Sequence, residues 1–133
     1  MSVAFDWADQ PGNVCVSDRA ERALLGALLL VGEAGLSRCG RLRPEDFRSA
    51  HRGAVLTAMR KVAFLETPID ALTVVDQLER GKHQPPEPGW GAAVASLLDD
   101  GTVGAADDDS IRAYARIVAE GSLYRRRAAW GGR

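Results

Sequence analysis

The chain has 133 residues, of which 46% are hydrophobic and 26% are charged, proportions typical of one globular domain. Its net charge of −1 argues against nucleic-acid binding over the whole surface, because phosphate contacts require a basic excess. The longest apolar run, residues 23–31, is far shorter than the roughly 20 residues needed to span a bilayer. The two cysteines form no CxxC pair and no apolar leader opens the chain, so we expect a cytoplasmic protein without membrane contact.

The first predicted helix follows residues 1–16, which are expected to form a flexible arm because turn-forming residues interrupt them. Ser17 can cap this helix, and the carboxylates of Asp18 and Glu21 suit the positive end of its dipole. Apolar residues then recur in steps of three and four as far as Val31, which is typical of a buried helix face. Additional leucines widen that face, so we expect this helix to be buried on more than one side.

Four further elements are predicted in the middle of the chain, and most have a recognisable boundary residue. Pro44 suits the first turn of a short helix, because its missing N–H would have no partner there. Ser49 and Asp70 can cap the two longer helices that follow, and Gly81 suits the end of the second. The four elements are expected over residues 33–38, 42–47, 50–65 and 71–80.

Two loops and two helices are predicted in the last third of the chain. Residues 82–89 contain three prolines, and residues 99–109 contain five aspartates, so both segments are predicted to be loops. A short helix over residues 90–98 lies between them, and the last helix covers residues 110–130. No run of strand length alternates apolar and polar residues, so the sequence predicts an all-α protein with about six helices.

Four pieces of this sequence, in their order, resemble the N-terminal domain of DnaB-type replicative helicases. The pieces are AERALLGALL at 20–29, LRPEDF at 42–47 with His51 after it, PID at 68–70 leading into 73–79, and YARIVAE at 114–120. Together they cover about residues 17–127. The resemblance implies one helical domain over residues 17–130, folded as a compact orthogonal bundle whose last two helices form a hairpin.

The chain departs from the family pattern in two loops, and it lacks the phosphate-binding motif of the family's ATPase domain. Residues 89–94 read GWGAAV, where the family usually has Gly-Gly and Tyr-Leu, and Asp107–Asp109 replace a usual asparagine. The chain contains no GxxxxGK[ST] phosphate-binding loop, so it lacks the cradle for ATP phosphates and is not expected to be an enzyme. We interpret it as either a stand-alone relative or a piece of a larger helicase.

No metal, cofactor or catalytic group is predicted. The residues that could ligate zinc are scattered, whereas zinc ligands usually come in close pairs. They are Cys15, Cys39, His51 and His83. Glu45 and Asp46 are interpreted as first-turn residues that favour the helix dipole, and Asp107–Asp109 as a helix cap and a solvated loop.

The resemblance places the interaction surface on the last two helices, which in the family pack against a second copy and receive the helicase-binding domain of primase. In the last helix, the stripe expected to be buried consists of Ile111, Tyr114, Ala115 and Val118. Several large apolar residues fall outside this stripe, and such residues often mark an interface. The alternative is that Leu123 and Trp130 fold back on the core. The candidate self-association or partner residues are Trp90, Val94, Leu97, Ile117, Leu123, Tyr124 and Trp130.

The last helix also ends in a basic segment. Its candidate contacts with nucleic acid or an acidic partner are Arg116, Arg125, Arg126 and Arg127. The alternative, which the net charge favours, is that these cations simply suit the C-terminal end of a helix and its solvated face.

The leading hypothesis is a non-catalytic interaction and oligomerisation module of DNA replication. The expected assembly is a dimer or a trimer of dimers, and the expected partner is a replicative helicase, a primase or a loader. Two alternatives remain open. One is a regulator that mimics and poisons a helicase ring, and the other is a small DNA-binding protein that uses the arginine-rich last helix.

Overall fold

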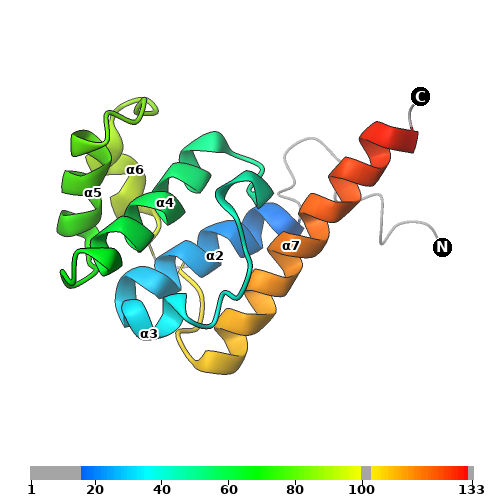
Figure 1. Cartoon of the computed structure of the whole chain (residues 1–133), viewed down its shortest axis with the longest axis horizontal. Helices are drawn as coiled ribbons and strands as arrows, with labels where there is room; N and C mark the ends of the chain where they lie inside the picture. The colour runs from blue at the N-terminus through cyan, green and yellow to red at the C-terminus, as the bar shows by residue number, and fades with distance from the viewer. Residues whose placement is uncertain (1–15, 100–102, 132–133) are drawn as a thin grey trace.

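The computed structural model describes residues 16–99 and 103–131, so the predicted arm, residues 1–16, lies outside the described residues except for its last position. The described residues form six α-helices, one 3₁₀-helix and no strand (Figure 1). The elements are α2 (Val16–Val31), α3 (Glu33–Leu36), η2 (Pro44–Asp46), α4 (Ala50–Phe64), α5 (Ala71–Arg80), α6 (Trp90–Ser96) and α7 (Asp108–Gly131). The predicted all-α class and number of helices are confirmed.

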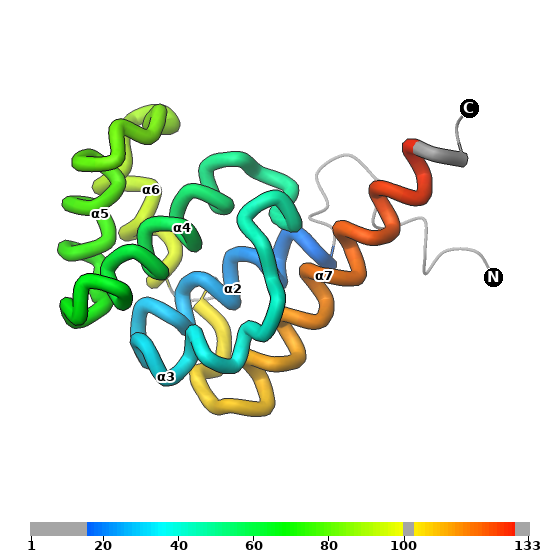
Figure 2. The backbone as a smooth tube through the Cα atoms, in the orientation of Figure 1, coloured from blue at the N-terminus to red at the C-terminus, as the bar shows by residue number. Residues whose placement is uncertain are grey.

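Helix α2 lies at the centre of the core. Its residues Leu24, Leu25 and Leu28 are fully buried, because α2 contacts α7, α4 and α3. Figure 2 shows α2 running between α4 and α7. The predicted burial of this helix on more than one side is therefore confirmed.

Side-chain caps set the beginning of the two middle helices, as predicted. The Ser49 hydroxyl accepts from the Arg52 amide at 3.3 Å and caps α4. At α5 the capping is reciprocal, because Asp70 accepts from the Thr73 amide at 2.9 Å while the Thr73 hydroxyl accepts from the Asp70 amide at 3.0 Å. The predicted cap at Ser17 is wrong, since this residue lies within α2.

The last two helices lie at different ends of the bundle (Figure 1). Helix α6 packs on α5, which packs on α4, whereas α7 packs along α2 and η2. Between α6 and α7 the chain crosses α2, where the Gly104 amide donates to the Ala23 carbonyl at 3.2 Å. The predicted hairpin of the last two helices is therefore not formed in this chain, because α2 covers the apolar stripe of α7.

Close packing at Gly26 gives a first testable prediction. A Cβ at this position of α2 would overlap the Leu97 carbonyl oxygen and lie 2.9 Å from a methyl group of Val103. Gly26→Ala is therefore expected to lower the free energy of unfolding by about 1–3 kcal/mol, although alanine favours a helix by about 1 kcal/mol. Urea denaturation measures the change.

The matched control is Gly91→Ala in α6, where an added Cβ meets nothing within 4 Å. This variant is expected to be as stable as the wild type or slightly more stable, because only the helix propensity changes. A Gly26→Ala variant that matched Gly91→Ala in stability would show that the contact between α2 and Leu97 is loose.

Candidate functional site

One face of α7 fixes this helix to the rest of the molecule. Its buried residues recur in steps of three and four and face α2 and η2. They are Ile111, Ala115, Val118 and Ser122. The first three lie on the stripe that the sequence predicted, and Ser122 continues it with a polar side chain.

A buried carboxylate in η2 holds α7 at Ser122. Asp46 is 6% exposed and accepts from the Ser122 hydroxyl at 2.8 Å and from the Arg43 amide at 2.9 Å. The Asp46 carbonyl also accepts from the Arg125 guanidinium at 2.8 Å. We call this set the Asp46 clamp; it fixes the direction in which the rest of α7 leaves the bundle.

The sequence interpretation assigned Asp46 only to the helix dipole and missed the clamp. The missed signal was Ser122, a polar residue in register with a buried apolar stripe. A buried polar side chain needs a hydrogen-bond partner, so its position indicated a partner elsewhere in the chain.

Beyond the clamp, α7 extends past the body of the bundle (Figure 1). We call residues 123–129 the outer end of α7; all of them are exposed except Arg125, which is half-buried. Tyr124 is 75% exposed and Leu123 is 43% exposed. Because successive helical residues turn by about 100°, these two side chains lie on different sides of α7, and Tyr124 shares its side with the half-buried Ile117.

The predicted partner residues in α6, and Leu97 directly after it, do not lie at the surface. Trp90, Val94 and Leu97 are buried in the chain's own core, and the Trp90 indole N–H donates to the His83 carbonyl at 3.0 Å. Their assignment to a partner surface is therefore wrong. The side chain of Trp130, the last residue of the predicted set, lies outside the described residues.

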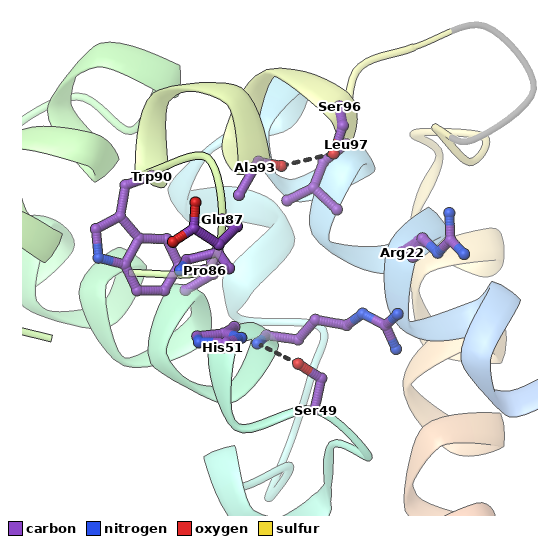
Figure 3. Close-up of a pocket in the computed structure, with 11 residues that line it drawn as sticks. Arg22, Ser49, His51, Pro86, Glu87, Trp90, Ala93, Ser96 and Leu97 are labelled. Atoms are coloured by element: carbon purple, nitrogen blue, oxygen red, sulfur yellow. Dashed lines mark hydrogen bonds between the residues drawn. The ribbon is translucent and has the colours of Figure 1, made fainter. Parts of the chain in front are cut away.

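A pocket of about 290 Å³ lies beside Trp90 (Figure 3). The His51 ring packs edge-on against the Trp90 ring there, with 5.7 Å between the ring centroids. The two arginines at its wall, Arg22 and Arg52, are both paired with Asp18, at 3.3 and 2.6 Å. Their charges are compensated within the chain, so the pocket offers an anionic ligand little attraction.

Arg52 also forms a buried ion pair with Glu21. Glu21 is fully buried, and its carboxylate accepts from Arg52 Nη1 and from the Arg48 amide, both at 2.7 Å. Burial lowers the pKa of Arg52, but the hydrogen bonds to Glu21 and Asp18 outweigh it and raise the pKa overall. The sequence interpretation of Glu21 as a dipole residue missed this pair, which joins α2 to α4.

The four candidate arginines differ in what they contact. Arg125 belongs to the Asp46 clamp and is half-buried, so less of its guanidinium is available to an external partner. Arg116 forms an exposed ion pair with Glu120 at 3.4 Å. Arg126 and Arg127 are exposed, which leaves two cations at the outer end of α7 for an external partner.

The other predicted polar residues have structural partners. As predicted, an aspartate caps α7: Asp107 accepts from the Ser110 amide at 2.8 Å and from its hydroxyl at 2.9 Å, and these bonds lower the pKa of Asp107. Cys39 is buried, which raises the pKa of its thiol. In the part of the chain that the structure describes, no three His, Cys, Asp or Glu side chains gather as metal ligands would.

A second exposed apolar set was not predicted from the sequence. Its members are Phe64 and Leu65 at the end of α4, Leu72 on α5 and Leu30 near the end of α2. The predicted helix over residues 50–65 included Leu65, but α4 ends at Phe64, and Leu65 is 53% exposed. None of the helices in the described ranges has the length and apolar character needed to cross a bilayer.

Fold and surface together define an all-α bundle with a long last helix whose outer end is exposed. The family model for the DnaB-like helicase N terminal domain matches residues 15–120. The chain therefore belongs to this family, and the resemblance seen in the sequence is confirmed.

Two relatives support the assignment. The replicative DNA helicase DnaB of Geobacillus stearothermophilus is 38% identical over 126 residues, which are 95% of this chain and 26% of that protein. The chain thus spans about a quarter of the length of this relative. The crystal structure of the N-terminal domain of DnaB helicase from Mycobacterium tuberculosis superposes with a TM-score of 0.72 at 32% identity, covering 86% of this chain and 79% of that one.

Proposed function

We propose that this chain is a non-catalytic assembly module of DNA replication in the cytoplasm. It self-associates through the outer end of α7, as a dimer or a trimer of dimers, and binds a replicative helicase, a primase or a loader. The observation that carries the proposal is the exposure of Tyr124 and Leu123 on a helix whose direction the Asp46 clamp fixes.

The physical basis is burial of an aromatic anchor on a rigid support. Tyrosine is enriched among the few residues that dominate binding energies, because it buries a large ring and loses little conformational freedom. Tyr124 is 75% exposed in the single chain, so most of its surface is available to a partner. Arg126 and Arg127 beside it would form a charged rim, which favours acidic partners.

Replacing the aromatic anchor, Tyr124, by a charged residue tests the proposed self-association. Tyr124→Asp is expected to raise the dissociation constant of self-association at least about 30-fold, because hot-spot residues contribute about 2 kcal/mol or more. Sedimentation equilibrium of the full chain measures the constant.

The matched control is Leu72→Asp on α5, which also replaces a largely exposed apolar residue, at 79% exposure. It should leave self-association unchanged. If Leu72→Asp weakened self-association and Tyr124→Asp did not, the interface would lie on the second exposed set and not on the outer end of α7.

A further inference from the structure

A basic groove lies between α7 and the segment that follows α3, which run side by side (Figure 1). Its volume is about 270 Å³. Four arginines line it, Arg38 and Arg41 from the segment and Arg112 and Arg116 from α7, and no carboxylate is among its lining residues. The groove follows the part of α7 that packs on α2, so it is separate from the outer end of this helix.

Two of the four arginines have no acidic partner in the described ranges. Arg38 pairs with Asp108 at 3.0 Å and Arg116 with Glu120 at 3.4 Å. Arg41 and Arg112 are exposed and form no ion pair with another described residue. The groove therefore carries two uncompensated positive charges.

A fifth arginine adds positive charge behind the groove. Burial raises the pKa of the Cys39 thiol, and the nearby charge of Arg60 acts in the opposite direction. Arg60 is half-buried and forms no ion pair with another described residue. Because Cys39 lines the groove, the charge of Arg60 strengthens the attraction of the groove for an anionic group.

The floor of the groove is apolar and firmly supported. It includes Leu42, Ala115 and Ala119 as well as Cys39. The two alanines lie one turn apart on the same side of α7, so no large side chain of this helix fills the space above them. Ala115 also belongs to the buried stripe that fixes α7 to the bundle, so the groove is formed before any partner binds.

This combination of charge and apolar floor restricts what the groove can bind. No aromatic side chain lines it, whereas single-stranded nucleic acid is usually bound through aromatic rings on which its bases stack. Its volume is below the roughly 300–1,000 Å³ of small-molecule sites. A stretch of polypeptide in which carboxylates flank an apolar side chain matches both the unpaired cations and the apolar floor.

We propose that the basic groove is a docking site for an acidic segment of a partner protein. Carboxylates of the segment pair with Arg41 and Arg112, and an apolar side chain between them packs on Leu42 and Ala115. This docking site does not rest on the self-association proposed above, because none of its residues belongs to the outer end of α7.

Fluorescence anisotropy of the full chain with the labelled peptide Gly-Asp-Asp-Leu-Asp-Asp-Gly tests the proposal. The wild type is expected to bind this peptide saturably, with a dissociation constant below about 1 mM. Arg41→Glu/Arg112→Glu should weaken binding at least about tenfold, because two charge pairs are replaced by two like-charge contacts. Replacing the leucine of the peptide by serine should also weaken binding about tenfold, because the apolar contact is lost.

A peptide of opposite charge, Gly-Lys-Lys-Leu-Lys-Lys-Gly, shows whether the variant retains a folded groove. It should bind Arg41→Glu/Arg112→Glu at least about tenfold more tightly than it binds the wild type, because the charges are exchanged. An unfolded variant would not show this gain. Neither peptide measurement requires self-association, so a failure here and a failure of the proposed assembly are distinguishable.

The matched control is Lys61→Glu/Lys82→Glu, which makes the same charge change at two exposed positions that do not line the groove. It should bind the acidic peptide as the wild type does. Absence of saturable binding to the wild type would overturn the proposal, as would equal binding by the wild type and Arg41→Glu/Arg112→Glu. A thymidine octanucleotide that bound more tightly than the peptide, and was lost in the same variant, would overturn it in favour of nucleic acid.

Discussion

Arg52→Met is expected to lower the free energy of unfolding by about 3–5 kcal/mol, because it leaves a buried charge without its partner. The Glu21 carboxylate is fully buried, and Arg52 compensates it at 2.7 Å. Without the guanidinium, Glu21 must remain charged in the core or take up a proton. Urea denaturation with circular dichroism measures the loss.

Two variants separate this effect from general damage at the α2–α4 contact. Glu21→Gln added to Arg52→Met should recover part of the lost stability, since the amide is neutral and its oxygen can still accept from the Arg48 amide. Arg22→Met should cost less than about 1 kcal/mol, because the Arg22–Asp18 pair is 3.3 Å long and the Arg22 side chain is 42% exposed. Equal losses in Arg52→Met and Arg22→Met would contradict the importance of the buried pair.

Asp46→Ala is expected to lower the free energy of unfolding by about 2–3 kcal/mol, because hydrogen bonds to a charged group are lost and a buried donor is left unpaired. The Ser122 hydroxyl, in a residue that is 3% exposed, would keep no acceptor from η2. Loss of the clamp should also loosen the direction of α7, so self-association should weaken together with stability.

The neighbouring Glu45→Ala is the control, because Glu45 is exposed and its side chain forms no hydrogen bond or ion pair with another described residue. It should leave stability and self-association near their wild-type values. If Asp46→Ala were as stable as Glu45→Ala, the clamp would make no net contribution to the position of α7.

Local signals in the sequence predicted most of the helices. Ser49 and Asp70 bond to backbone amides three residues away, and such short-range contacts can be anticipated from residue type and spacing alone. The apolar stripe of α7 was also predictable, because helical periodicity identifies the buried face of a helix without knowledge of what covers it.

What covers a buried face could not be predicted. The apolar stripe of α6 was assigned to a partner, yet Trp90 and Val94 pack inside this chain, because periodicity does not distinguish a core from an interface. The Glu21–Arg52 and Asp46–Ser122 contacts join residues 31 and 76 positions apart. One sequence carries no pairing information over such separations, so both carboxylates were assigned to helix dipoles.

The mass of the wild-type chain in solution, measured by light scattering behind a sizing column over a range of concentrations, tests self-association most directly. We expect a mass of at least twice the 14.3 kDa of one chain at the higher concentrations, falling towards that value on dilution and in Tyr124→Asp. A mass of 14.3 kDa at every concentration would contradict self-association through the outer end of α7.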